Sequence, residues 1–274
     1  MLKLYAFLAA VITLLLDIPF EVFKQPYSWW LVPTIMIAAF VALILLHAIA
    51  FLIGVLTVNI NKPPRDTGLF RALLSGLLQI AFPILRIKVH ATGLEKVPMD
   101  QPILLVSNHL NEADPAIIYY SLPHAHLSFI GKKEVKELYP FVYKVMHKLN
   151  GLSIDRENNR EAVKTIIGAA NLIKEQRSSV AVFPEGYVSL SGELQPIRNG
   201  ALKIATKSQA KIVVCTIWGT KDFGKNLFKR KMDIYFDVLD VIDTSDNTHT
   251  SELGDQIHSI MLENLNKVKA NEKQ

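Results

Sequence analysis

A long segment without any formal charge constrains this chain more than any other feature. Residues 25 to 61 contain no Asp, Glu, Lys or Arg, and Trp29 and Trp30 stand near the start of the run. The run exceeds the roughly 20 residues that a helix needs to cross a bilayer, and tryptophan favours the bilayer interface. We therefore predict a transmembrane helix from Leu31 to about Val58. His47 falls within it, and we expect this residue to pack against a neighbouring helix rather than to react.

A shorter apolar segment precedes this run, from Leu4 to Leu16, and is followed by Asp17 and Glu21. Its length fits a half-inserted or re-entrant helix as well as a full span. A signal peptide would need a small-residue cleavage site after the apolar run, and the sequence has none there. We predict an uncleaved hairpin with the long helix, so that residues 1 to 61 anchor the protein in the cell membrane.

Basic residues predict which side of the membrane the rest of the chain occupies. Lys62, Arg65 and Arg71 follow the long helix, whereas only Lys24 lies between the two apolar segments. Because basic residues are enriched in cytoplasmic loops, we expect the domain after the helices to be cytoplasmic.

The overall composition agrees with a membrane protein. Half of the residues are hydrophobic and the mean hydropathy is +0.24, while the net charge is +5 and the pI about 9.1. The basic balance favours anionic lipid as a partner, and no interleaving of aromatic and basic residues supports nucleic-acid binding. The single cysteine, Cys215, lies in an apolar run, so we expect a small buried hydrophobe and no disulfide or cysteine-based metal site.

Residues 62 to 84 connect the membrane segments to the remainder of the chain. Residues 62 to 68 are predicted to be a linker, and Leu69–Phe82 a helix that Pro83 ends. This helix is apolar except for one polar stripe at four-residue spacing, made of Arg71, Ser75 and Gln79. Such a helix suits either the lipid headgroup region or a position docked under the domain.

From residue 85 to 274, predicted strands alternate with predicted helices. This order indicates a single α/β domain with a mostly parallel mixed sheet flanked by helices. The expected strands are an edge-like Leu85–His90, Ile103–Val106, Leu127–Ile130, Val180–Phe183, Ile212–Trp218 and Met232–Val238. The expected helices cover residues 115 to 122, 134 to 149, 161 to 176, 200 to 208 and 253 to 268.

A histidine and a carboxylate follow the predicted strand Ile103–Val106, in the stretch from Asn108 to Pro115. Open α/β sheets bind ligands at the carboxyl ends of their strands, and a histidine held by a carboxylate can take a proton from a hydroxyl at neutral pH. No Ser or Cys nucleophile stands nearby, so the substrate's own hydroxyl is the expected nucleophile. In the alternative interpretation, Asp114 only caps a helix that begins at Pro115, and His109 is an ordinary loop residue.

Basic residues lie near strand or helix ends in several further stretches. They occur in Gly131-Lys132-Lys133-Glu134, in the run from Gly151 to Asp155-Arg156, and in Pro196-Ile197-Arg198-Asn199-Gly200, while Phe183-Pro184-Glu185-Gly186 places a carboxylate after a buried strand. A single loop cation is usually only solvated. Several that converge at one sheet edge could hold a phosphate, which arginine binds in bidentate fashion.

Taken in this order, the stretches resemble the motifs of the glycerolipid acyltransferase family typified by 1-acyl-sn-glycerol-3-phosphate acyltransferase. The Asn-His motif, with Asp five residues after the His, corresponds to Asn108, His109 and Asp114. The Gly-x-x-x-Asp-Arg motif corresponds to Gly151, Asp155 and Arg156, and the Phe-Pro-Glu-Gly motif to residues 183 to 189. The likeness covers about residues 85 to 240.

This resemblance implies an O-acyltransferase of phospholipid biosynthesis. His109 would be the general base and Asp114 would orient it, while acyl-CoA or acyl-carrier protein would supply the acyl group to lysophosphatidate. The other implied substrate-binding residues are Asn108, Lys132, Lys133, Arg156, Glu185, Gly186 and Arg198. The chemistry needs no cofactor or metal, and His124 and His126 lack a third ligand nearby in the sequence.

The sequence departs from the family pattern at three positions. Tyr187 and Val188 stand where the family usually has Thr and Arg, and Cys215 stands where a Pro is common. The loss of a motif arginine leaves other acceptors open, namely another lysophospholipid, glycerol 3-phosphate or a glycolipid, and also a catalytically weak lipid-binding protein. Alternatively, Lys132, Lys133 or Lys203 replaces the missing cation.

Overall fold

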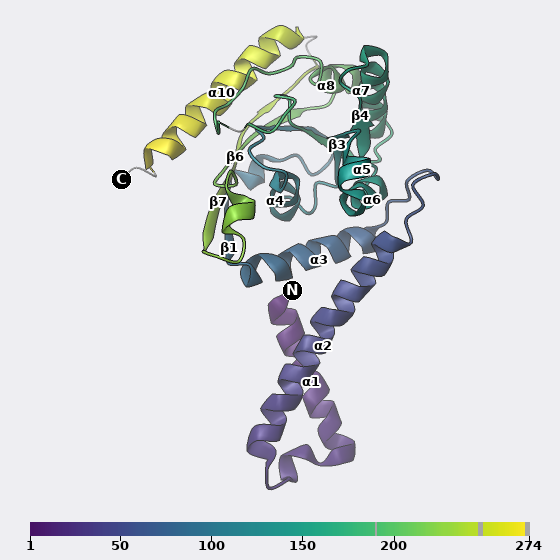
Figure 1. Ribbon diagram of the computed structural model, residues 1–274, viewed down its shortest axis with the longest axis vertical. Helices are drawn as coiled ribbons and strands as arrows, with labels where there is room; N and C mark the ends of the chain where they lie inside the picture. The colour runs from purple at the N-terminus through teal and green to yellow at the C-terminus, as the bar shows by residue number, and fades with distance from the viewer. Residues whose placement is uncertain (190, 246–248, 272–274) are drawn as a thin grey trace.

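Two apolar helices at the start of the chain form a hairpin that projects from the rest of the molecule (Figure 1). Helix α1 covers Leu2–Phe20 and α2 covers Ser28–Leu56, with a short 3-10 turn, η1, at Val22–Lys24 between them. By length and composition, both helices could cross a membrane. The predicted hairpin is therefore present, although α1 continues beyond the predicted end at Leu16 and includes Asp17.

The hairpin is fixed to the next helix through His47. Its Nδ1 lies 2.6 Å from the hydroxyl of Tyr5 in α1, and its Nε2 lies 2.8 Å from the carbonyl oxygen of Leu73 in α3. A Cβ atom on Gly76 would approach the imidazole to 2.5 Å, so only glycine allows this contact. His47 thus packs between helices, as predicted.

Helix α3, Gly68–Ile84, lies between the hairpin and the domain (Figure 1). Its Arg71 is buried, donates to both carboxylate oxygens of Asp66 and reaches the carbonyl oxygen of Leu127 at 3.1 Å. The polar stripe therefore turns partly inward, and the helix is docked under the domain. The predicted end at Pro83 is wrong, because proline in the last turn lacks only a hydrogen-bond donor and the helix continues to Ile84.

A sheet of seven strands forms the centre of the domain, in the order β1-β7-β6-β2-β5-β3-β4. All neighbours are parallel except β6 and β7, so the mostly parallel mixed sheet predicted from the sequence is confirmed. The strands are β1 (Ile87–Thr92), β2 (Leu104–Ser107), β3 (Leu127–Lys132), β4 (Leu152–Ile154), β5 (Ser179–Val182), β6 (Ile212–Trp218) and β7 (Met232–Ile242).

Helices and short turns connect these strands. They are η2 (Leu94–Lys96), α4 (Asp114–Ser121), α5 (Val135–Leu138), α6 (Pro140–Lys148), α7 (Asn159–Lys174), α8 (Lys203–Ser208), α9 (Phe223–Asn226) and α10 (Thr250–Asn271). The single helix predicted over residues 134 to 149 is wrong: it breaks at Tyr139, because the residue before a proline avoids helical geometry. The helix predicted from Gly200 begins only at Lys203.

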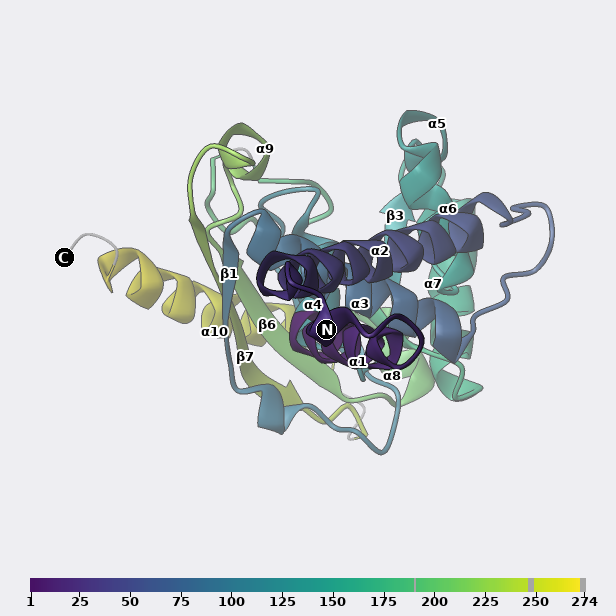
Figure 2. The same cartoon turned by 90° about the horizontal axis from the view of Figure 1, so that it is seen from below.

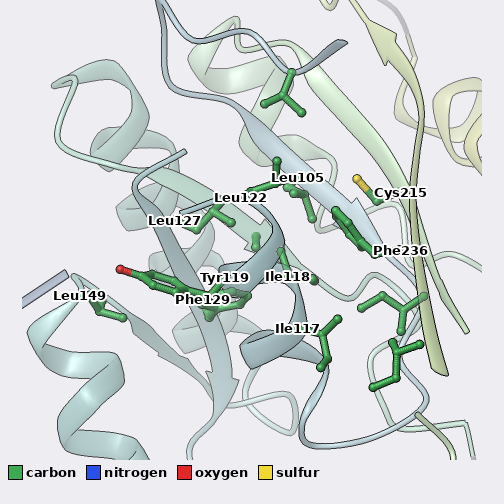
Figure 3. Close-up of a cluster of buried hydrophobic side chains, with 14 of the residues drawn as sticks. Leu105, Ile117, Ile118, Tyr119, Leu122, Leu127, Phe129, Leu149, Cys215 and Phe236 are labelled. Carbon is green, nitrogen blue, oxygen red and sulfur yellow. The ribbon is translucent and has the colours of Figure 1, made fainter. Parts of the chain in front are cut away.

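Apolar side chains pack on both faces of the sheet. On one face, α3 and α4 cover the sheet, and the fully buried Tyr119 and Phe236 lie among leucine and isoleucine side chains together with Cys215 (Figure 3). On the other, α7, α8 and α10 cover Leu104 and Val106 of β2. Truncating one such leucine to alanine typically costs about 2–5 kcal/mol, so these two clusters contribute strongly to the stability of the domain.

The structure is a computed structural model that describes residues 1–189, 191–245 and 249–271. Viewed from the hairpin side, α5 and α9 project beyond the same edge of the domain, on either side of α4 (Figure 2). The loops that follow β2, β5, β3 and β4 reach the sheet edge that carries the strands' carboxyl ends. The candidate catalytic and substrate-binding residues predicted from the sequence lie on these loops or next to them.

Candidate active site

Four parallel neighbours, β2, β5, β3 and β4, bring separate motifs to one sheet edge. His109 comes two residues after the end of β2, and Glu185 follows β5, the strand that pairs with β2. Lys132 is the last residue of β3, and Arg156 follows β4, which pairs with β3. The carboxyl ends of parallel strands meet at the same edge, which is where ligand sites occur in such sheets. Residues far apart in sequence thereby form one site.

The carboxylate of Asp114 holds His109 in place. Its Oδ2 lies 2.9 Å from Nδ1 of His109 and also accepts backbone hydrogen bonds from Leu110 and Asn111 at 2.7 and 2.8 Å. Asp114 is fully buried, begins α4 and makes no capping bond at its N-terminus. The alternative in which Asp114 only caps the helix is therefore wrong, since its carboxylate faces back toward the preceding loop.

The hydrogen bond at Nδ1 determines what the other ring nitrogen can do. Because a carboxylate only accepts, Nδ1 carries the proton and Nε2 of a neutral His109 carries the lone pair. No described residue hydrogen-bonds to Nε2, and the ring is stacked on Phe183 with centroids 4.0 Å apart and planes 12° from parallel. Asp114 thus holds the imidazole at Nδ1 and Phe183 holds one face of the ring, while the basic Nε2 has no hydrogen-bond partner among the described residues.

Asn108 fixes the loop that carries the histidine. Its side-chain amide donates to the carbonyl oxygen of Ile217 at 2.9 Å and accepts from the Ile217 backbone nitrogen at 2.7 Å. The residue is buried, and Ile217 occupies both atoms. We infer a positioning role in which Asn108 ties the end of β2 to β6, in place of the direct substrate contact predicted from the motif.

Glu185 supports the same loop from the β5 side. Its Oε1 accepts from the backbone nitrogen of His109 at 2.7 Å and its Oε2 from that of Gln195 at 2.8 Å. Burial raises the pKa of the Glu185 carboxyl, and these two backbone donors partly oppose the shift. Glu185 therefore joins the two loops that build the site, and its side chain reaches no further than their backbones.

Two arginines form a positive region beside the histidine. Arg156 is half-buried, and its burial together with the nearby charge of Arg198 lowers its pKa. Gly186 has φ +87°, and a Cβ atom there would meet Nε of Arg198 at 2.9 Å, so a glycine is needed for the arginine to lie across the loop. Neither arginine forms an ion pair within the described part of the chain. The charge of Glu134 also acts on Arg156, without forming an ion pair with it. Two close cations that form no ion pair of their own favour an anion between them.

The two predicted lysines have different surroundings. Nζ of Lys133 lies 2.8 Å from Oδ2 of Asp155, and this hydrogen bond lowers the pKa of Asp155. Lys132 makes no such pair among the described residues and lines the cavity described below. Lys132 is therefore available to a ligand, while Lys133 pairs with Asp155 of the Gly-x-x-x-Asp-Arg motif.

An apolar cavity of about 370 Å³ begins at His109 and extends between the sheet and the neighbouring helices. Its volume lies in the range of small-molecule sites. Leu74 and Leu78 of α3 form one wall. The other main contributors are Pro115, Ala116 and Tyr119 of α4, Phe129 of β3, and Val142, Val145 and Met146 of α6. Sequence reasoning missed this wall, because apolar periodicity marks a buried helix face without saying which cavity it borders.

Three positions noted in the sequence fall in different places around this site. Val188 and Arg156 both line the cavity, so the valine puts an apolar surface where the family motif has an arginine. Tyr187 is exposed, and its hydroxyl donates to Oε1 of Gln195 at 3.2 Å. His124 and His126 precede β3 at the opposite ends of the strands, away from His109.

Comparisons with known proteins agree with this geometry. Residues 88–218 match the model of the acyltransferase family. A 1-acyl-sn-glycerol-3-phosphate acyltransferase of Borreliella burgdorferi is 26% identical over 62% of this chain and 68% of its own length. An enzyme of the same name from Limnanthes douglasii is 28% identical over 82% of this chain and 79% of its own length.

A solved structure shares the fold over nearly the whole chain. The crystal structure of the 1-acyl-sn-glycerophosphate acyltransferase PlsC from Thermotoga maritima superposes with a TM-score of 0.65, covering 98% of each chain at 20% identity. The family match includes the His109–Asp114 pair, Arg156 and Glu185. The resemblance indicated by the motifs is thereby confirmed, and residues 88–218 match the acyltransferase family as a domain of this chain.

Proposed function

We propose that this protein transfers a fatty acyl group from acyl-CoA or acyl-carrier protein to the free hydroxyl of 1-acyl-sn-glycerol-3-phosphate, which gives phosphatidic acid. One observation carries the proposal above all: an oriented histidine and Arg156 line the same apolar cavity, and Arg198 lies close enough for its charge to act on Arg156. A base, an acyl-sized apolar space and an anion-binding region are what this reaction requires. The names of the relatives support the same acceptor.

In the proposed reaction, Nε2 of His109 removes the proton from the acceptor hydroxyl while its oxygen attacks the thioester carbon. Asp114 stabilises the imidazolium that forms. The tetrahedral intermediate then collapses, the carbon–sulfur bond breaks, and the imidazolium returns the proton to the leaving thiolate. The products are the ester and a free thiol, so the atoms balance without a metal or a redox cofactor. The acyl donor is a co-substrate.

The phosphate of the acceptor would bind between Arg156 and Arg198, with Lys132 nearby. An anion there removes the repulsion between the two guanidinium groups, and hydrogen bonds to charged groups contribute more than neutral ones. We propose that Lys132 supplies the cation that Val188 does not. Gly186 would contribute indirectly, because its bare backbone allows Arg198 to lie across the loop.

The fatty acyl chain of the donor would occupy the apolar cavity, with its thioester carbonyl carbon close to His109. The wall formed by Leu74 and Leu78 belongs to α3, the helix that His47 ties to the membrane hairpin. A chain from the bilayer could therefore enter beside the membrane segments without crossing water. We propose that the hairpin is integral to the cell membrane and that the domain lies on the cytoplasmic side, since Lys62 and Arg65 follow α2.

Val188 favours a second candidate for the acceptor. An apolar side chain in the cavity wall removes one positive charge relative to the family motif. A different lysophospholipid, glycerol 3-phosphate or a glycolipid is therefore the alternative substrate. A lipid-binding protein without activity is the remaining alternative, and the geometry of His109 argues against it, because binding alone needs no oriented base.

The experiment that tests the proposal measures acyl transfer by the full-length protein in bilayer nanodiscs. Radiolabelled acyl-CoA and acyl-carrier protein serve as donors, and lysophosphatidate, glycerol 3-phosphate, other lysophospholipids and a glycolipid as acceptors. Val188→Arg is the matched variant, since it restores the family residue at the cavity wall. We expect transfer to lysophosphatidate by the natural chain, with little change in acceptor preference in the variant.

Two results would contradict the proposal. Transfer to uncharged headgroups alone, with a shift toward lysophosphatidate in Val188→Arg, would mean that Val188 has redirected the acceptor. Absence of transfer with every donor and acceptor pair, in protein that remains folded in the nanodiscs, would favour the lipid-binding alternative.

A further inference from the structure

The connection between β6 and β7 carries most of the excess charge of the chain. Residues 219 to 231 contain five basic residues and one acidic residue, against a net charge of +5 for the whole sequence. Lys225 pairs with Asp222 at 3.0 Å and Lys231 with Asp233 at 2.9 Å. In the described part of the chain, the exposed Lys229 and Arg230 form no ion pair.

This connection also exposes an aromatic side chain. Leu227 packs toward the apolar core, whereas the next residue, Phe228, is 79% exposed. Phe228 has φ +67°, a conformation that bulky residues avoid and that usually persists where the surroundings or a function require it. The backbone thus turns a large apolar group outward next to two free cations.

A second segment joins the same surface. The backbone nitrogen of Met232 donates to the carbonyl oxygen of Arg86 at 3.0 Å, which ties the connection to the end of α3. Ile84, the last residue of α3, is 62% exposed, and Arg86 is exposed with φ +58°. We call Ile84, Arg86, Phe228, Lys229 and Arg230 the basic tip.

The basic tip lies on the side of the domain from which the membrane hairpin projects. In Figure 1, the lower ends of β1 and β7 meet the end of α3 just above the hairpin. Figure 2, seen from the hairpin side, places β1, β7 and α9 beside α3 on the same face. The hairpin would therefore hold this surface close to the lipid headgroups.

We propose that the basic tip is a second membrane contact that binds the anionic headgroup layer, with Phe228 and Ile84 inserted among the lipids. Cations around exposed apolar residues are the combination that peripheral segments use on anionic membranes, and each nearby Lys or Arg adds to the attraction. The hairpin alone could let the domain tilt about α2. A second contact at the C-terminal end of α3 would hold the domain in one orientation. In that orientation the opening of the cavity would face the membrane that supplies the acceptor lipid.

The test places an environment-sensitive fluorophore on full-length protein in nanodiscs. Phe228→Cys provides the attachment site, because Cys215 is fully buried and stays unlabelled. Val163→Cys on α7 is the matched control, since Val163 is also an exposed apolar residue, 55% accessible, but lies away from the hairpin. Lys229→Cys gives a second labelling position should Phe228→Cys fold poorly.

With phosphatidylglycerol in the bilayer, we expect a blue-shifted emission at position 228 and quenching by lipids that carry a spin label in the upper acyl chain. The shift should be smaller in pure phosphatidylcholine and smaller when Lys229→Gln and Arg230→Gln are combined. The label at position 163 should stay aqueous throughout. The readout needs no enzymatic activity, so it is independent of the proposed function.

Three outcomes would overturn the proposal. Equal solvent exposure at positions 228 and 163 in anionic bilayers would remove the membrane contact. An equal blue shift at position 228 in anionic and in pure phosphatidylcholine bilayers would show that the cations do not contribute to the contact. Shielding of position 228 by added acyl-carrier protein, and not by lipid, would assign the basic tip to an acidic protein partner.

Discussion

Two histidines of this chain, the buried His47 and the partly buried His109, show that the same side chain can have a structural or a chemical role. In His47, Tyr5 and the Leu73 carbonyl occupy both ring nitrogens, and the residue joins three helices. In His109, Asp114 occupies Nδ1, Nε2 has no hydrogen-bond partner among the described residues, and the residue lines the apolar cavity. A histidine with both nitrogens satisfied can hold a structure together, whereas one with a free, oriented nitrogen can also accept a proton.

The comparison predicts that the partner of each histidine has a different function. Asp114→Asn should lower acyl transfer about 10³-fold or more, because an amide can hold the imidazole in the wrong tautomer. Membrane insertion and thermal stability should change far less than activity. Initial rates with lysophosphatidate in nanodiscs provide the measurement, and a variant with near-natural rates would show that the carboxylate does not orient the base.

The cations beside His109 should affect binding rather than chemistry. Arg156→Gln should raise KM for a phosphorylated acceptor about 10- to 100-fold, since it removes charge-assisted hydrogen bonds. Arg177→Gln is a matched control, because Arg177 is also a surface-accessible arginine but lies at the opposite ends of the strands. Steady-state kinetics at varied acceptor concentration separate KM from kcat. An unchanged KM in Arg156→Gln would exclude this arginine from the phosphate site.

For the structural histidine, His47, the substitution His47→Gln should weaken the attachment of the hairpin to α3. The loss of one or both buried hydrogen bonds should lower the free energy of unfolding by about 1–3 kcal/mol. Thermal unfolding in detergent measures this loss, while activity at low temperature should be retained. Loss of activity in a fully folded His47→Gln protein would contradict the purely structural assignment.

The smallest expected effect concerns the ion pair between Lys133 and Asp155. Because the hydrogen bond from Lys133 lowers the pKa of Asp155, the folded state binds this proton less tightly than the unfolded state. The pair therefore stabilises the fold above the ordinary carboxyl pKa of about 3.9, and this contribution is lost as the pH falls through the lowered value. Asp155→Asn should lower the Tm slightly at neutral pH, and the difference should disappear in acid. A difference independent of pH would contradict the ion-pair explanation.

The sequence predicted the site better than its surroundings, for physical reasons. The His109–Asp114 pair and Arg156 follow short apolar strands, whose parallel arrangement is implied by the alternation of strands and helices. Contacts between segments that are distant in the sequence leave no such pattern in the residues around either partner. The cavity wall from α3 and the Ile217 contact that occupies Asn108 depend on segments distant in the chain.

Element ends were harder to predict than element types. The break at Tyr139 depends on the effect of Pro140 on its neighbour, whereas Pro83 is tolerated in a last turn. The antiparallel direction of β7 follows from the tertiary pairing of Met232–Ile242 with β6, which apolar alternation alone cannot reveal.

A single-turnover measurement of acyl transfer with His109→Gln and His47→Gln, in the same nanodiscs as the natural protein, tests the central claim most directly. The account predicts that His109→Gln slows the transfer step about 10²- to 10⁴-fold. His47→Gln should keep the natural rate while the protein is folded. If His109→Gln transferred the acyl group at the natural rate, or if the two variants lost activity equally, His109 would not be the base of this reaction.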